Sequence, residues 1–353
     1  MAAFSHIFGQ DAALDWLLRA YRADRLPHGL IFAGPAGVGK ATTARALGKL
    51  FLCERPMPEP SPCGHCDSCR VLDAGNHPDF HVVTKELIRF HDKTGKSKGI
   101  SLSIDVVRPE LIEPAGRKPV MGRGKVFVVE QADLMTAQAQ NALLKTLEEP
   151  AGRALIVLLT DQPDGLLQTI RSRCQMVRFA ALDAGRSAAE LAKRGVDADT
   201  AKRAAAYAGG SLGVALKWIE DGVVPNADAL TGMIESLFGG RAPPDFPGWL
   251  KAAADAYAKK QIERDELGSE DQARREGIGL YLHLAGEACR GRLERLAAAD
   301  APDGEAMERA CGVVDALRLA EEYLEANVNV ALVFQQLAAA LERAARGAAA
   351  AAR

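Results

Sequence analysis

The segment 34–41, with the sequence GPAGVGKA, constrains the fold of this chain more than any other feature. It follows the apolar run of residues 30–33 and precedes a helical pattern over residues 40–52, so it joins a buried strand to a helix. Glycines in such a link let backbone N–H groups turn toward phosphate oxygens, and the lysine meets the β and γ phosphates. The segment therefore predicts a phosphate-binding loop at the end of a strand.

One component of the phosphate-loop pattern G-x-x-x-x-G-K-[ST] is missing. Gly34, Gly39 and Lys40 occupy their positions, but residue 41 is Ala and has no hydroxyl for Mg²⁺. Thr42 is a poor substitute, because the next position of a helix points about 100° away. The loop could hold ATP or ADP, whereas we expect poor magnesium binding.

Two further apolar runs, residues 125–129 and 154–159, read as buried strands. Continuous apolar strands that alternate with helices indicate a parallel α/β sheet. Strand signals stop near residue 180, and a chain of 353 residues is long enough for two or three domains. We expect an α/β domain over residues 1–180, a small helical domain over 181–226 and an all-helical domain over 227–353.

The segment 126–133, VFVVEQAD, is the second element that a phosphate-loop ATPase needs. Such enzymes carry an acidic pair after this strand, which holds Mg²⁺ and positions the attacking water. Here the pair is Glu130 and Gln131, and a neutral amide cannot act as a general base. The alternative is a core strand with a polar end. Together with the loop, the segment predicts a nucleotide site that has lost its chemistry.

A cluster of four cysteines with the spacing C-x9-C-x2-C-x2-C predicts a metal site, formed by Cys53, Cys63, Cys66 and Cys69. Four thiolates close a tetrahedral shell around Zn²⁺ and leave no open position, so the predicted role is structural. An iron–sulfur cluster and free thiols are the alternatives. The typical C-x3-C-P continuation of a ferredoxin motif is missing.

Charge and hydropathy exclude some classes of protein. With 44 basic and 46 acidic residues the net charge is −2, so the chain as a whole is not a basic nucleic-acid binder. A basic stretch at residues 91–98, with Arg108, Arg117 and Lys118, could face DNA phosphates or form a solvated loop. No apolar run reaches the roughly 18 residues of a membrane span, and no signal peptide is visible, so we expect a cytoplasmic location.

Four segments carry a resemblance to a known family: FSHIFGQDAAL (4–14), RLPHGLIFAGPAGVGK (25–40), NALLKTLEEP (141–150) and SRC (172–174). They are similar to bacterial clamp-loader subunits of the AAA+ class, strongly over residues 4–220. Within the family the chain resembles most the delta-prime type of DNA polymerase III. The motor subunits, tau and gamma, carry Ser or Thr after the loop lysine, an Asp–Glu pair in the second element and a lid arginine where this chain has Gly213.

The resemblance implies roles for individual residues. Arg173 corresponds to an arginine finger that acts in trans on the ATP site of a neighbouring subunit, against the alternative of a solvated or salt-bridged residue. Thr160 corresponds to a γ-phosphate sensor or, alternatively, caps the end of its strand. The nucleotide-binding candidates are Gly34, Gly37, Gly39, Lys40, Thr42, Glu130 and Thr160.

The resemblance also implies a function and partners. We expect a stator subunit of the replicative clamp loader within the DNA polymerase III holoenzyme, with no or negligible ATPase of its own. Its partners would be the delta and tau/gamma subunits in a hetero-pentameric ring, and through the ring the sliding clamp and primed DNA. One alternative is a catalytically active tau/gamma-type subunit. Another is a zinc-dependent nucleic-acid binder outside any ring.

Overall fold

The computed structural model describes residues 4–92, 100–121, 123–241, 243, 245–265, 268–298 and 304–346. The chain forms two compact units, one made of Met1–Glu190 with Ala208–Val214 and the other of Leu191–Tyr207 with Ala215–Arg353. The chain passes between them three times: within α9 (Ala184–Lys193), after Tyr207 and within α11 (Leu212–Glu220). In the described ranges no helix is both long and apolar enough to cross a membrane.

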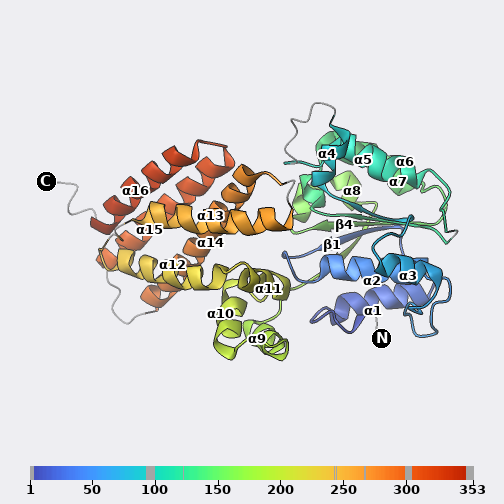
Figure 1. Cartoon of the computed structure of the whole chain (residues 1–353), viewed down its shortest axis with the longest axis horizontal. Helices are drawn as coiled ribbons and strands as arrows, with labels where there is room; N and C mark the ends of the chain where they lie inside the picture. Colours follow the sequence, from blue (N-terminus) through green and yellow to red (C-terminus); the bar gives the residue numbers. More distant parts are fainter. Residues whose placement is uncertain are drawn as a thin grey trace. The chain divides into compact units, whose positions relative to one another are not determined.

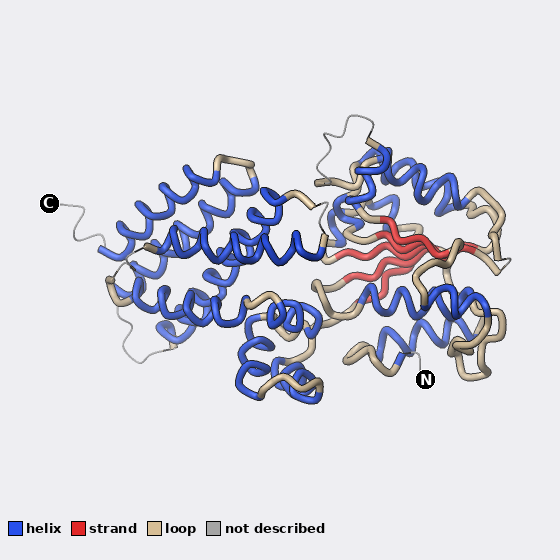
Figure 2. Tube along the Cα trace, viewed as in Figure 1, coloured by secondary structure: helices blue, strands red, loops and turns tan. Residues whose placement is uncertain are grey.

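The first unit is built on a five-stranded, fully parallel sheet in the order β2-β3-β4-β1-β5 (Figure 2). The strands are β1 (Gly29–Ala33), β2 (Phe80–Val83), β3 (Lys125–Val129), β4 (Ala154–Thr160) and β5 (Gln175–Arg178). Strand β1 lies inside the sheet, where Leu30 pairs with Val157 on one side and Gln175 on the other. The loop that follows β1 therefore emerges from the middle of the sheet.

Helices cover both faces of this sheet (Figure 1). One face carries α1 (Asp11–Arg22), α2 (Lys40–Leu52) and α3 (Asp67–Asp73). The other carries α4 (Ile88–His91), α5 (Ile104–Val107), α6 (Glu113–Ala115), α7 (Ala137–Glu148) and α8 (Gln168–Arg171). Between β2 and α4, and again between α5 and α6, the chain makes short helical turns, Lys85–Leu87 and Arg108–Ile112.

The double cover explains why the central strands are apolar at every position. Side chains alternate between the two faces of a strand. Ile31 packs against helices on the face that carries α7, while Leu30 and Phe32 pack against α1 and α2 on the other face. All residues of β1, β3 and β4 are buried, so each must be compatible with a core.

The second unit is helical in its described residues and has its own core. Its helices are α10 (Ala198–Tyr207), α12 (Val223–Phe238), α13 (Phe246–Arg264), α14 (Glu270–Ala297), α15 (Gly304–Glu325) and α16 (Val330–Arg346). Helix α14 packs on α12, α13 and α15, and α15 packs on α16. Tyr281 on α14 is almost fully buried. Its ring packs edge-on against Trp249, with 5.7 Å between the ring centroids, and its hydroxyl accepts a hydrogen bond from Asn226 Nδ2 at 2.8 Å.

The predicted α/β architecture is confirmed: a parallel sheet with an inserted cysteine module, followed by a helical part. The predicted helix over residues 40–52 coincides with α2, and the three predicted strands coincide with β1, β3 and β4 to within one residue. The division into an α/β domain, a lid and a collar at residues 180 and 226 stays a prediction.

Candidate functional site

The glycine loop between β1 and α2 is shaped by backbone contacts that only glycine permits. Gly34 N–H donates to the Thr160 carbonyl at 3.2 Å, and a Cβ at Gly34 would lie 2.1 Å from the Phe179 carbonyl oxygen. Gly39 caps α2 with a left-handed backbone (φ 101°). The loop therefore returns tightly over the sheet and presents the amino end of α2, where backbone N–H groups favour anions.

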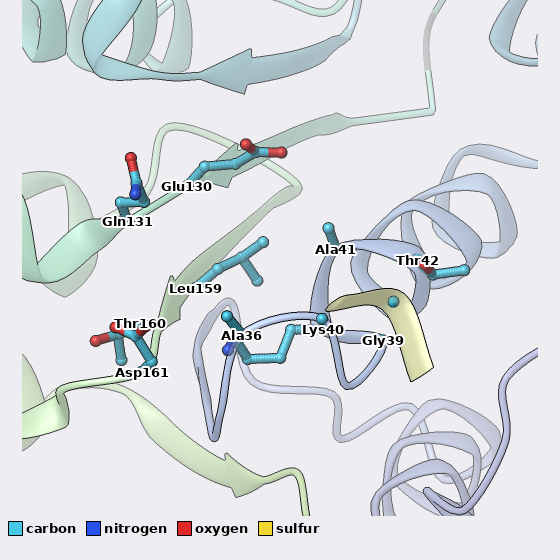
Figure 3. Close-up of a pocket in the computed structure, with 12 residues that line it drawn as sticks. Ala36, Gly39, Lys40, Ala41, Thr42, Glu130, Gln131, Leu159, Thr160 and Asp161 are labelled. Carbon is cyan, nitrogen blue, oxygen red and sulfur yellow. The ribbon is translucent and has the colours of Figure 1, made fainter. Parts of the chain in front are cut away.

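Lys40, the first residue of α2, reaches back along the loop (Figure 3). Its Nζ donates to the Gly34 carbonyl and, at 2.7 Å, to the Pro35 carbonyl. Burial lowers the pKa of Lys40, and the charges of Asp161 and Asp133 act in the opposite direction. The ammonium group is thus a partly desolvated cation, whose interaction with a phosphate would be stronger than in water.

Beside the loop lies a cavity of about 530 Å³, a size suited to a small organic ligand. Six of the seven predicted nucleotide-binding residues line it: Gly37, Gly39, Lys40, Thr42, Glu130 and Thr160. Gly34, the seventh, lies where the loop leaves β1. The cavity is also lined by Ala36, Ala41, Gln131, Leu159, Asp161 and Gly213.

The positions where a motor enzyme would need magnesium ligands and a base face this cavity. Ala41 offers only a methyl group, and the side chain of Thr42 points away from Glu130 (Figure 3). Glu130 follows β3, and burial, aided by the charge of Glu86, raises its pKa. Gln131, with a left-handed backbone (φ 49°), supplies an amide in place of a carboxylate.

Thr160 ends β4 with a hydroxyl that already has two partners. Its Oγ1 donates to Asp133 Oδ1 at 2.6 Å and accepts from the Gln162 N–H at 3.0 Å. Neither Asp133 nor Asp161 was among the predicted residues. Asp161 could have been found from its place directly after a buried strand, at the edge where ligands of parallel sheets bind.

Residues 211–214, which lie at the start of α11, contact the glycine loop. Ser211 Oγ donates to the Ala36 carbonyl at 2.7 Å, and the Gly213 N–H donates to the Gly37 carbonyl at 3.0 Å. A Cβ at Gly213 would lie 2.6 Å from that same carbonyl oxygen. The contact therefore leaves no room for a side chain at position 213.

Arg173 lies at the opposite end of the sheet from the glycine loop. It comes two residues before β5, whose Gln175 pairs with Leu30, whereas the loop begins after Ala33. In a parallel sheet all amino ends share one edge, and five residues of strand span roughly 16 Å. The Arg173 side chain is 35% exposed and pairs with Glu148. Arg173 thus lies at the edge of the sheet that is remote from the glycine loop of its own chain.

The four predicted metal ligands come together. The sulfur atoms of Cys53, Cys63, Cys66 and Cys69 all lie within 4.8 Å of one another. Cys53 Sγ and Cys66 Sγ are 4.0 Å apart, close to the separation of roughly 3.8 Å that Zn–S bonds of about 2.3 Å would give in a tetrahedron. The donor set and its spacing fit a closed zinc site.

Backbone N–H groups surround these sulfurs. The N–H groups of Cys63 and Cys66 donate to the sulfurs of Cys53 and Cys63 at 3.3 and 3.4 Å. The His65 N–H is the main cause that lowers the pKa of Cys63 to about 6, while burial raises the pKa of Cys53 and Cys69. Such N–H donors suit thiolates, the form in which cysteine binds metals.

Most of the basic stretch at residues 91–98 lies outside the described residues. Arg108, Arg117 and Lys118 are described and exposed. Their contact with DNA stays a prediction.

Comparison with known proteins adds an independent finding. Residues 9–183 match the family described as "DNA polymerase III, delta subunit". The DNA polymerase III subunit delta' of Bacillus subtilis (strain 168) is 36% identical over 173 residues, which are 49% of this chain and 48% of that protein. The subunit delta' of Escherichia coli (strain K12) is 38% identical over 160 residues, 45% and 44% of the two chains.

A tau/gamma subunit is also similar. The DNA polymerase III subunit tau/gamma of Haemophilus influenzae is 33% identical over 180 residues, 51% of this chain and 24% of that protein. The chain thus spans about half the length, or less, of these relatives.

Proposed function

From the premise that residues 9–183 form a domain of the DNA polymerase III delta-prime type, we propose that the chain is a stator subunit of a replicative clamp loader. It assembles with delta and tau/gamma subunits in a hetero-pentameric ring that opens the sliding clamp and places it on primed DNA. Residues 181–226 would be the lid of the nucleotide site and residues 227–353 the collar of the ring.

The observation that carries this proposal is the separation of two half-sites on one sheet. The carboxyl edge holds the glycine loop and the cavity, with Ala41 and Gln131 where magnesium chemistry needs oxygen ligands and a base. The amino edge holds Arg173, exposed and remote from that cavity. A guanidinium so placed can stabilise charge only on a phosphate that another chain holds.

The test is Arg173→Ala in the complex reconstituted with cognate delta and tau/gamma subunits. An arginine finger contributes about 10³-fold or more to its site, so the turnover of the neighbouring site should fall by about this factor and the ATPase of the assembly should drop. Arg171→Ala is the matched control, because Arg171 is a neighbouring arginine that pairs with Asp164 at 2.6 Å. An unchanged ATPase in an intact Arg173→Ala complex would falsify the finger.

The cofactors follow from the same geometry. Zinc at the four cysteines would be structural, because a four-thiolate shell has no open position. ATP or ADP would lie in the cavity beside Lys40, where this chain's contribution is binding without turnover.

A tau/gamma-type motor is the second candidate, favoured by the retained glycine loop and the similarity to a tau/gamma subunit. The two functions differ in the isolated chain. The stator would show no magnesium-dependent ATP hydrolysis, and the double variant Ala41→Thr with Gln131→Glu tests whether the missing groups are the cause. Clear turnover by the natural chain would favour the motor.

A further inference from the structure

Glu148 and Arg173 form an ion pair between two segments of the first unit that are 25 positions apart in the chain. Glu148 is the last residue of α7, and Arg173 lies between α8 and β5. Arg173 Nε donates to Glu148 Oε1 at 2.6 Å, and Nη2 contacts the same oxygen. Two N–H groups on one carboxylate fix the plane of a guanidinium, which a single contact would not do.

A third contact fixes the far side of the guanidinium. Arg173 Nη1 donates to the Thr169 carbonyl at 3.1 Å and to Ser172 Oγ at 3.4 Å. An arginine carries five N–H donors, and Glu148, Thr169 and Ser172 together engage four of them. The group therefore keeps one N–H donor for an external anion while its orientation is set by its own chain.

Both Glu148 and Arg173 are adjacent in the chain to buried residues of the first unit. Leu147, which precedes Glu148, is buried, and its carbonyl contacts the His28 ring at the start of β1. Cys174, which follows Arg173, is buried beside Gly29. Buried neighbours restrict both backbones, so the pair loses little further freedom when it forms.

Stability of α7 does not explain a glutamate at this position. The carboxyl end of a helix carries partial negative charge, and an acidic side chain in the last turn is unfavourable there. Glu148 is half exposed, with 47% of its side chain accessible, so the pair contributes little to folding. Orientation of Arg173 is the role that the contacts support.

We propose that Glu148 is a positioning residue, which holds Arg173 in the orientation that presents its guanidinium to the nucleotide of the adjacent subunit. The proposal rests on the proposed role of Arg173 as a finger in trans. Glu148 touches no substrate itself and acts through the arginine. Outer partners that orient metal ligands change activity by about 10- to 100-fold when removed, and we expect an effect of this order for a residue that orients a guanidinium.

The experiment is Glu148→Gln in the reconstituted complex, with Glu149→Gln as the matched control. Glu149 is the next residue and is also exposed. We expect Glu148→Gln to lower turnover at the neighbouring site roughly tenfold, with an unchanged KM for ATP. Glu149→Gln should leave turnover unchanged.

A double-variant cycle separates this role from a general effect on the fold. In an Arg173→Ala background, Glu148→Gln should have no further effect, because the group it positions is absent. An equal loss in both backgrounds would overturn the positioning role. If Arg173→Ala itself has no effect, the finger fails; if only Glu148→Gln has none, the finger stands and the positioning role fails.

A direct readout uses the isolated full chain. The Arg173 Nε–H should give a slowly exchanging ¹⁵N NMR signal that persists in Glu149→Gln and is lost in Glu148→Gln. Persistence of the signal in Glu148→Gln would show that Glu148 does not hold the guanidinium.

Discussion

Glu130 is an acidic residue whose burial opposes its ionised form. It follows β3, lines the cavity and is half-buried. Burial raises its pKa first of all, and the nearby charge of Glu86 adds to the effect. The ionised carboxylate is therefore less favourable in the folded chain than in the unfolded one.

Glu130→Gln should accordingly raise the thermal midpoint of the chain at pH 8. The folded state holds a proton that the unfolded state releases, so stability falls as pH rises through the raised pKa of Glu130. The gain of the variant should shrink toward the ordinary pKa of 4.5, measured by thermal unfolding from pH 5 to 8. Exposed Glu149→Gln is the control, and a variant less stable than the natural chain at pH 8 would contradict the expectation.

Individual residues also show which parts of the site could be predicted from the sequence and which could not. Gly37, Gly39 and Lys40 could be predicted to line the site because the loop pattern fixes them in one short segment. Asp133 and Glu148 could not, because their partners lie 27 and 25 positions away and only the tertiary fold brings them together.

At the scale of elements, the contact between residues 211–214 and the glycine loop is a packing constraint. Gly213 donates its N–H to Gly37, and neither position has room for a side chain. A motor-type arginine at Gly213 would therefore displace the start of α11 from the loop rather than add a catalytic group.

Gly213→Arg should loosen the loop without restoring hydrolysis. Overpacking of this kind costs about 1–3 kcal/mol, so amide hydrogen exchange over residues 34–40 should accelerate. Gly232→Ala on α12, where a Cβ meets nothing within 4 Å, should leave exchange in the loop unchanged. An unaltered exchange rate in Gly213→Arg would mean that the contact does not hold the loop.

The cysteine module (residues 53–69) is expected to need a metal at its four sulfur atoms to keep its structure. Cys53 directly follows α2 and Cys66 caps the start of α3. A zinc ion at the four sulfurs would therefore link these two helices. Without a metal, three buried thiols would hold a short loop that has little other core.

Cys53→Ser should abolish stoichiometric zinc and lower the free energy of unfolding by roughly 3 kcal/mol or more. Metal analysis and thermal unfolding, with and without a chelator, give the two readouts. Cys311→Ser, at an exposed position of α15, should change neither. Retention of one zinc per chain in Cys53→Ser would contradict a four-cysteine site.

Sequence patterns predicted the elements that are buried on both faces and missed the edge elements. Strands β1, β3 and β4 are apolar throughout and stand out. The edge strands β2 and β5, four residues each, carry partly exposed polar residues such as His81 and Arg178. Half-covered strands of this length have no continuous apolar signal, so only sheet pairing defines them.

At the scale of the whole molecule, the two units have separate hydrophobic cores. Helices α12 to α16 enclose one, and the sheet with its two helical layers encloses the other. A unit with its own core can fold alone.

A fragment of residues 191–346 should therefore fold by itself. It keeps α10, which packs on α12, together with the five long helices. Circular dichroism should show a helical spectrum and a cooperative thermal transition. A fragment with a gradual, non-cooperative transition would show that this core depends on the rest of the chain.

The placement of Arg173 and the glycine loop on opposite edges of one sheet gives the subunit a direction. Rings of similar subunits are built head to tail, so each member meets one neighbour with its amino edge and the other with its carboxyl edge. In the proposed ring this chain activates the neighbour that it faces with Arg173, but passes no hydrolysis signal through its own cavity. The ring would therefore contain one position without ATP hydrolysis. Sequential hydrolysis from subunit to subunit would end at this position instead of continuing around the ring.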